Sequence, residues 1–220
     1  IDSIDWLTPR PKAKVAYDLS HRPQLGVDSW DTDNIQIYDP GESYSELRNS
    51  YVNHSYTFDK LYPSSEGNFT SDRLSNFDMI ILAWPNFNLT VSERTALLDW
   101  INDGGSLFAL ADRSGFMPNQ GYFILNWTIQ DLDISIGVYN IQDDVSATFS
   151  EPRHPTTEGC SSIQVSWRNY LNITRPAAQP IFDYEGNIVL ASQQYGAGRV
   201  VVSSDLNIFA NTRMISTPSN

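Results

Sequence analysis

The stretch LTVSERTALLDWINDGGSLFALAD, Leu89–Asp112, contains a helix start, a helix end and a buried strand in direct succession. Thr90-Val-Ser-Glu93 has the form of a capping box, the reciprocal pairing of side chains and backbone that begins many helices. An apolar stripe at helical spacing follows, and Gly104-Gly105 supplies the left-handed residues that end a helix. The run SLFALAD after these glycines predicts a strand.

A second apolar run precedes this helix. DMIILAW, Asp78–Trp84, is nearly continuous in apolar residues, as is typical of a parallel strand that is covered on both faces. Strand, helix and strand then form a βαβ unit, which is right-handed and parallel in nearly all known cases. KVAYDLSH (14–21) and YTFDKLY (56–62) predict two further strands of the same sheet.

Two more helices are predicted from capping and spacing. Ser43-Tyr-Ser-Glu46 resembles a second capping box, with Tyr44, Leu47 and Tyr51 at helical spacing around it. Leu125, Ile129, Leu132 and Ile136 have the spacing of another helix.

The last third of the chain changes character. Residues 163–167 and 180–209 predict strands that are joined by a Glu-Gly-Asn turn and a Gly-Ala-Gly turn. We therefore expect an α/β fold with a doubly wound, mainly parallel sheet and a C-terminal antiparallel β ribbon. The expected organisation is an N-terminal arm (1–12), one α/β domain (13–211) and a C-terminal tail or linker to a missing segment (212–220).

Charge and hydropathy restrict the partners. The formal net charge is −12, which argues against nucleic acid because binding phosphates requires a basic surface. The longest strongly apolar run, Met79–Trp84, has about six residues, whereas a bilayer span needs roughly 20. A membrane is therefore expected only through a segment outside this sequence.

Five Asn-x-Ser/Thr triplets suggest an extracytoplasmic location, at a cell surface or after secretion. The asparagines are Asn53, Asn68, Asn88, Asn126 and Asn172. Coincidence is the alternative explanation. The single cysteine, Cys160, excludes an internal disulfide and is expected to be a small, buried or half-buried thiol, with a reactive or intermolecular role as the alternative.

Four pieces of the chain, in this order, resemble the class I glutamine amidotransferase-like superfamily: DMIILAWPN, LTVSERTALLDWINDGGSLFALAD, HPTTEGCSSI and YGAGRVVVSSDLNIFAN. The narrower resemblance is to its non-catalytic branch, found in archaeal and bacterial membrane-anchored proteins of unassigned function, in intraflagellar transport proteins and in the 48-kilodalton oligosaccharyltransferase subunit. HPTTEG also resembles trehalose-utilisation-type members. The resemblance covers residues 13–211 and implies a flavodoxin-like fold.

In catalytic members of this superfamily, the strand that corresponds to SLFAL leads into a G-x-C-x-G elbow that carries the nucleophile. Here the matching positions are Ala111 and Asp112. Ser114 is the remaining candidate, but no Gly-x-Ser-x-Gly surrounds it, and a turn serine beside Gly115 is the simpler interpretation. We therefore expect no catalytic residue and no enzymatic activity.

Ligands of doubly wound sheets bind beyond the carboxyl ends of the strands. A candidate ligand rim at that edge consists of Asp18, His21, Trp84, Asn86, Asp112 and Arg113. The alternative is that the polar members cap helices and satisfy loop backbone.

Neither a metal nor a cofactor is expected. The three histidines are too scattered for a metal-ligand spacing. Asp28, Asp31 and Asp33 could bind calcium through oxygens but lack the other positions of an EF-hand loop, so we expect an ordinary acidic loop, with calcium binding as the alternative. His154 before Pro155 is expected to set a turn.

The leading hypothesis is a non-enzymatic, glycosylated extracytoplasmic domain of a surface-anchored chain that contacts other proteins, copies of itself or N-linked glycans. The first alternative is a hydrolase that uses Asp112, His21 or His154 as acid and base. The second is a carbohydrate-binding module that uses loop aromatics such as Trp6 and Trp30.

Overall fold

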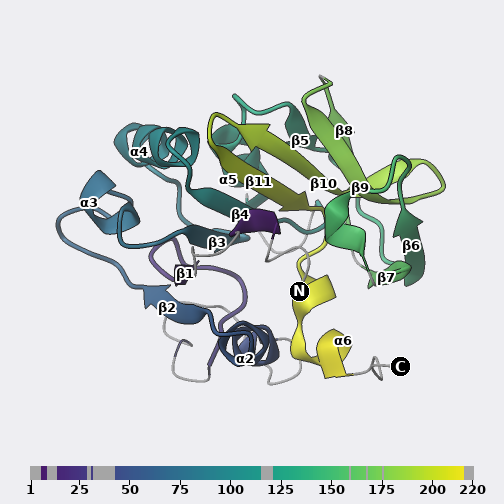
Figure 1. Ribbon diagram of the computed structural model, residues 1–220, viewed down its shortest axis with the longest axis horizontal. Coiled ribbons are helices and arrows are strands. Elements are labelled where there is room, and N and C mark those ends of the chain that lie inside the picture. Colours follow the sequence, from purple (N-terminus) through teal and green to yellow (C-terminus); the bar gives the residue numbers. More distant parts are fainter. Residues whose placement is uncertain are drawn as a thin grey trace.

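The computed structural model describes residues 6–8, 14–28, 31, 43–114, 121–158, 160–166, 168–174 and 176–215 (Figure 1). The strands are β1 (Lys14–Asp18), β2 (Thr57–Leu61), β3 (Met79–Ala83), β4 (Ser106–Leu110), β5 (Ile134–Ile136), β6 (Val145–Phe149), β7 (Ser162–Val165), β8 (Leu171–Ile173), β9 (Ala178–Tyr184), β10 (Asn187–Tyr195) and β11 (Gly198–Ser203). The helices are α2 (Ser45–Asn53), α3 (Ser71–Leu74), α4 (Val91–Asn102), α5 (Gly121–Thr128) and α6 (Asn211–Ile215), with short 3₁₀ turns η2 (Pro155–Thr157) and η3 (Asn207–Phe209).

Five strands form the parallel part of the sheet, in the order β2-β1-β3-β4-β11. Every residue of β3 and β4 is buried, as their continuous apolar sequences predict. Met79 of β3 pairs with Val15 on one side and Ser106 on the other, so these strands end at the same edge. The predicted strands 14–21, 56–62 and 78–84 are confirmed.

The other part of the sheet is antiparallel. β11 pairs with β10, and β9, β6 and β7 continue the sheet, while β8 and β5 form a branch beside β10. Glu185 and Gly186 both have positive φ (52° and 79°), as a tight hairpin turn requires. The predicted ribbon is therefore present, but it is continuous with the parallel strands, and the sheet is mixed rather than mainly parallel.

Helices lie on both sides of this sheet. In Figure 1, α3 and α4 lie above the parallel strands, and α2 and α6 lie below them. The capping box that begins α4 forms as predicted, because the Thr90 hydroxyl accepts from the Glu93 N–H and the Glu93 carboxylate accepts from the Thr90 N–H.

The capping box predicted at Ser43–Glu46 is wrong. Tyr44 is the N-cap of α2 and makes no side-chain capping bond. Asn211 of α6 supplies the cap instead: its Oδ1 accepts from the Glu46 N–H at 2.8 Å, and its Nδ2 donates to the hydroxyls of Ser43 and Ser45. Tyr44, Leu47 and Tyr51 are buried, as their spacing predicts.

The helix predicted through Leu125, Ile129, Leu132 and Ile136 is also wrong in its second half. α5 ends at Thr128, and Ile136 belongs to β5, which pairs with β8. The buried apolar residues of the following turn and of β5 continue the spacing of the helix by coincidence. In short apolar segments, the spacing of apolar residues alone cannot distinguish a helix from a strand.

The chain on either side of the domain packs against it. Leu7 is buried and its carbonyl accepts from the Ser106 hydroxyl, while the Trp6 carbonyl accepts from Arg199. At the other end α6 continues to Ile215, past the expected boundary at residue 211. Among the described helices, none has both the length and the apolar character that a membrane span requires.

Candidate functional site

The carboxyl ends of β1 and β3 bring four of the predicted rim residues together: Asp18, His21, Trp84 and Asn86. The Asn86 N–H donates to the His21 carbonyl (3.0 Å), and the Trp84 carbonyl accepts from the Gln24 N–H (3.1 Å). Asp18, His21 and Trp84 are buried, and Asn86 is half-buried. This part of the rim is a compact polar cluster and not a set of separate loop residues.

His21 lies between two carboxylates. Its Nδ1 is 2.8 Å from Asp18 Oδ2, and its Nε2 is 3.9 Å from Glu93 Oε2. Glu93 was not predicted as a rim residue. The capping box was the signal that could have identified it, because the first turn of a crossover helix lies at the carboxyl edge of the sheet. Glu93 also accepts from the Asn68 N–H (2.9 Å), so it connects the starts of α3 and α4 to β1.

The charges in this cluster change the pKa values of His21 and Glu93. Burial alone would lower the pKa of His21, but the charge of Asp18 and its hydrogen bond, together with the charge of Glu93, raise the pKa above its ordinary value. Burial opposes the ionisation of Glu93, yet its bonds to Thr90 and Asn68 and the nearby imidazolium lower the pKa of Glu93. The cluster therefore favours the charged form of His21 together with the ionised form of Glu93.

The geometry differs from that of a nucleophilic triad. The Ser20 hydroxyl donates to Asp18 Oδ1 and lies 3.1 Å from His21 Nδ1. In a triad, the serine and the acid contact opposite nitrogens of the imidazole. Here both contact the same side of the ring, so Ser20 is not placed to transfer its proton to the free nitrogen.

Asp112 and Arg113 form a second cluster at the end of β4. Asp112 Oδ1 accepts from the Arg113 N–H (2.6 Å), and Arg113 donates to Asn140 Oδ1 (3.0 Å). Asn169 donates to the Asp112 carbonyl and, through its own N–H, to the Ser204 carbonyl. These bonds tie the ends of β4 and β11 to the segments that follow β5 and β7.

β4 is followed by Ala111 and Asp112, the two positions that the resemblance matches to an elbow nucleophile. The buried Ala111 donates its N–H to the Ser203 carbonyl (2.9 Å). Ser114 is half-buried, and its N–H donates to the Tyr139 carbonyl (2.7 Å). Gly115 lies outside the described residues.

His154 lies elsewhere, with both ring nitrogens engaged. Its Nδ1 is 2.9 Å from the Thr156 hydroxyl and its Nε2 is 3.1 Å from the Ser192 hydroxyl, while its ring packs edge-on against Trp6. Burial lowers the pKa of His154. The residue caps η2 and joins it to β10, which matches its expected role in a turn.

The acidic loop is an ion-pair cluster. Asp28 pairs with Arg48 and Lys60, and Asp31 pairs with Lys60 while accepting two backbone N–H bonds from 27 and 28. Asp33 and Trp30 lie outside the described residues. Within the part of the chain that the structure describes, no group of three or more His, Cys, Asp or Glu side chains is arranged to hold a metal. Cys160 is half-buried.

The five glycosylation candidates have different surroundings. Asn53, Asn88 and Asn172 are exposed. Asn68 is half-buried, and its Oδ1 accepts from the Ser64 N–H. Asn126 is half-buried too, and its amide makes a two-bond pair with the backbone of Ile136, in which Nδ2 donates to the carbonyl at 2.8 Å. The atom that a glycan would modify is therefore engaged in the fold at Asn126.

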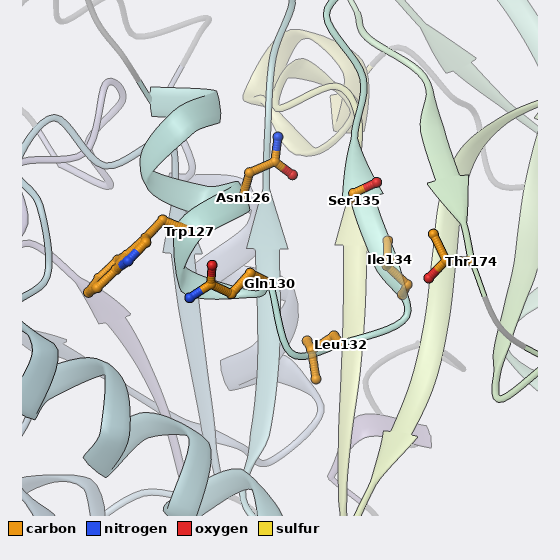
Figure 2. Close-up of a pocket in the computed structure, with 7 residues that line it drawn as sticks. All are labelled: Asn126, Trp127, Gln130, Leu132, Ile134, Ser135 and Thr174. Carbon is orange, nitrogen blue, oxygen red and sulfur yellow. The ribbon is translucent and has the colours of Figure 1, made fainter.

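A pocket of ≈ 390 Å³ lies between the end of α5 and the β5–β8 pair. Its lining residues are Asn126, Trp127, Gln130, Leu132, Ile134, Ser135 and Thr174. Figure 2 shows Trp127 and Asn126 pointing to opposite sides of α5. The guanidinium of Arg94 lies over the Trp127 ring, 5.4 Å from its centroid, so the aromatic face is already engaged. The lining side chains do not converge on a common point.

Most of the strongly exposed large apolar side chains lie in a few segments of the chain. Seven such side chains are found within the described residues, and six of them lie in segments that follow β2, β3 or β5 or in the first turns of α4 and α5. The six are Tyr62, Phe87, Val91, Phe123, Val138 and Tyr139; the seventh, Val52, lies in the last turn of α2.

Comparisons with known proteins were made on sequence and on structure. No family model and no curated protein matches the sequence. Among solved structures, the mmIFT52 N-terminal domain superposes with a TM-score of 0.66 at 13% identity, over 92% of this chain and 90% of that one. The cytoplasmic protein STM1381 from Salmonella typhimurium LT2 gives 0.61 at 15% identity, over 87% of both chains.

A ThuA-like protein from Bacteroides uniformis gives a TM-score of 0.53 at 13% identity, over 95% of this chain and 86% of that one. At these identities the likeness concerns the fold alone. The chain shares the fold of these proteins, in agreement with the resemblance to the glutamine amidotransferase-like superfamily.

Proposed function

We propose that this chain is a non-enzymatic protein-interaction domain, and that its partner docks on the carboxyl edge of the parallel strands. The supporting observation is that six of the seven strongly exposed large apolar side chains of the described residues lie in segments at or beside that edge. Contiguous exposed apolar patches mark interaction surfaces in soluble proteins, and the proposal is that these side chains form one. The strand order β2-β1-β3-β4-β11 supports a doubly wound, flavodoxin-like architecture. Our assignment to the non-catalytic branch is part of the proposal and rests on the residues at the elbow positions, Ala111 and Asp112.

Enzymes of this architecture bind their substrate at this edge of the sheet. In this chain, we propose, the same edge binds a partner protein instead. Ala111 and Asp112 occupy the positions of the elbow, and the Asp112 carboxylate accepts from the next backbone N–H. Ser114 has no neighbouring sequence of the elbow type, and Ser20 lies on the wrong side of His21 for activation. These features favour binding over catalysis.

The partner is a protein of different sequence, with apolar side chains surrounded by positive charge. A net charge of −12 on each copy opposes self-association and attracts a basic surface. The five Asn-x-Ser/Thr triplets support an extracytoplasmic location, in a glycosylated chain that is anchored to a membrane by a segment outside this sequence.

The test begins with the partner that copurifies with the tagged protein from its own source cells. After that partner has been identified and purified, its Kd is measured for the wild type, for the triple variant Phe87→Ser/Val91→Ser/Phe123→Ser, and for the matched control Val52→Ser. We expect at least a tenfold weaker Kd for the triple variant, because central apolar contacts typically contribute about 1 kcal/mol or more each. The control should bind as the wild type does.

Two results would overturn this proposal. One is a triple variant that retains the wild-type melting temperature and the wild-type Kd, since the edge would then not be the docking surface. The other is a hydrolytic activity of the purified protein that Asp112→Asn or Ser114→Ala abolishes.

A further inference from the structure

Within the described residues, the facing loops after β1 and β3 hold four side chains with buried polar atoms that make no hydrogen bond. One is His21, whose Nε2 faces the Glu93 carboxylate at 3.9 Å, and the atoms of the other three are Gln24 Oε1 and Nε2, Trp84 Nε1 and Asn86 Oδ1. Gln24 is 1% exposed and Trp84 is fully buried. A buried polar group without a partner destabilises the fold, because it loses its hydrogen bonds to water and gains none in return. Native proteins therefore keep few such groups, and those that remain call for an explanation.

The backbone brings these atoms together. Pro23 and Pro85 form an isolated antiparallel bridge, and the Gln24 N–H donates to the Trp84 carbonyl. Residues that face each other across an antiparallel pair have side chains on the same side, which places Gln24 next to Trp84. Asn86 is fixed at the same junction, because its Nδ2 donates to the Arg22 carbonyl (2.8 Å).

The same junction contains strained backbone. Arg22 and Trp84, one on each loop, have positive φ angles of 50° and 36°. Large side chains rarely adopt this region, and such residues cluster at ligand sites, where the surrounding structure holds them in place. Unpaired buried polar atoms and strained backbone therefore occur at the same junction. Proteins typically keep such unfavourable features at functional sites.

The indole of Trp84 is held in one orientation. A Cβ added to Gly121, the first residue of α5, would lie 2.5 Å from the ring. Only glycine allows α5 to pack this closely on the Trp84 ring. The indole N–H is therefore a positioned donor.

The available atoms indicate the chemistry of a ligand. Trp84 offers a donor, Asn86 an acceptor, and Gln24 one of each. The neighbouring His21 faces two acidic side chains, Asp18 and Glu93, so the junction has no excess of positive charge that would favour an anion. A hydroxyl group can both donate and accept a hydrogen bond, so it suits this mixture of donors and acceptors. The unpaired atoms belong to three residues on two loops, and a ligand with a single amide group could not bond to all of them.

We propose that the junction of the loops at 22–24 and 84–86 binds a small neutral polyhydroxylated molecule, a polyol or a monosaccharide. Binding requires the side chains that now bury these atoms to move, and release of the strain at Arg22 and Trp84 favours that movement. The site uses buried polar atoms and not the exposed apolar side chains of the edge, so it is independent of the protein-docking proposal.

The indole N–H of Trp84 reports on the site directly. In a ¹H–¹⁵N spectrum of the labelled protein, its signal is assigned by its absence in Trp84→Phe and by through-bond connection to the backbone. The intact protein is then titrated with glycerol, with glucose and, as an anionic control, with sodium acetate. We expect a saturable shift of the Trp84 signal with at least one of the two polyols and none with acetate.

Gln24→Met tests the hydrogen bonds without a large change of side-chain volume. We expect it to weaken polyol binding at least tenfold and to raise the melting temperature of the free protein, because it removes a buried amide without partners. Gln179→Met, at an exposed position of β9, is the matched control and should change neither.

Three results would overturn this inference. They are a Trp84 signal that does not shift saturably with either polyol, a response to acetate instead of polyols, and wild-type polyol affinity in Gln24→Met. A higher melting temperature for Gln24→Met without any polyol binding by the wild type would show that the amide is a packing imperfection. None of these results bears on the Kd of the protein partner, which depends on Phe87, Val91 and Phe123.

Discussion

The Glu93 side chain both caps its own helix and contacts residues from distant parts of the chain. Its carboxylate accepts from the Thr90 N–H and hydroxyl, which begins α4, and from the Asn68 N–H, which fixes the start of α3. It also lies 3.9 Å from His21 Nε2. The capping role is visible in the sequence. The pairing with His21 depends on β1 and α4 meeting at one edge.

The first prediction concerns His21 and pH. Because its pKa is raised in the folded state, the folded protein keeps a proton that the unfolded chain loses above its ordinary value of 6.5. The contribution of His21 to stability is therefore complete below pH 6.5 and is lost as the pH rises through the folded pKa. We expect the free energy of unfolding, measured with urea, to fall between pH 6 and pH 8.

The variant His21→Gln should flatten this dependence, because it removes the group that titrates. Gln179→Met, at an exposed position outside the cluster and without a titratable group, is the control and should leave the slope as it is. An unchanged slope in His21→Gln would show that Asp18 and Glu93 do not hold the imidazolium.

The second prediction concerns Asp205, at the end of β11. Burial raises the pKa of Asp205 to about 7, although it accepts the N–H groups of Ser166 and Asn207. Its protonated form is favoured in the folded state, so stability is lost as the pH rises from 3.8, the ordinary value, through about 7. A tenfold difference in proton affinity between the folded and unfolded states corresponds to about 1.4 kcal/mol.

Asp205→Asn should therefore gain stability relative to the wild type as the pH is raised from 4 to 8, by up to about 4 kcal/mol. Guanidinium unfolding of both proteins across this range measures the difference. Parallel stability curves would contradict the prediction, since they would mean that Asp205 titrates alike in the folded and unfolded states.

At the scale of elements, the start of α2 depends on Asn211, a residue of α6 that lies 165 positions after Glu46. Asn211 Oδ1 accepts from the Glu46 N–H, and Nδ2 donates to the hydroxyls of Ser43 and Ser45. A helix N-terminus leaves backbone N–H groups without partners, and here α6 satisfies one of them. The two helices on this side of the sheet therefore stabilise each other.

The third prediction follows from that cap. Asn211→Ala should lower the free energy of unfolding by about 1–2 kcal/mol, the usual cost of losing an N-cap, because the Glu46 N–H loses its partner. Thr212→Ala, at the next and exposed position, should cost much less. Chemical denaturation of the three proteins measures both changes, and equal losses in the two variants would disprove the capping role.

The elements that the sequence predicted well are those with local signals. The apolar runs of β3 and β4, the capping box of α4 and the turn at Glu185-Gly186 depend on residues close to one another in the chain. α5 and β5 were predicted as one helix because the apolar spacing continues across the turn. Pairing of β5 with β8 overrides that spacing, and the partner strand lies about 40 residues away.

At the scale of the whole molecule, Asn88 bears on two proposals, the glycosylation of the chain and the docking of a partner protein. This exposed residue lies between Phe87 and Val91, two of the apolar side chains of the docking edge. A glycan there would cover the surface that the partner is proposed to contact. Asn53, in the last turn of α2, and Asn172, in β8, are exposed away from those two side chains.

The fourth prediction is that glycan occupancy separates bound from free protein. Glycopeptide mapping of material from the source cells should find glycans on Asn53 and Asn172 in both fractions, and on Asn88 only in the fraction without partner. Asn126, whose Nδ2 is engaged with Ile136, should carry none. Full occupancy of Asn88 in the bound fraction would contradict docking at this edge.

The sequence by itself determined the parallel strands, the helix between β3 and β4 and the final ribbon, because these features depend on short-range pattern and residue identity. It also placed Asp18, His21, Trp84 and Asn86 at the same edge, since parallel strands that neighbour one another end together.

Only the tertiary structure decided that Glu93 faces His21, that Asn211 caps α2, and that Gln24, Trp84 and Asn86 bring buried polar atoms without hydrogen bonds to one junction. Each of these facts depends on which side chains meet across distant segments. Hydrogen bonds and ion pairs form between atoms about 3–4 Å apart, so no periodicity along the chain can specify them before packing does.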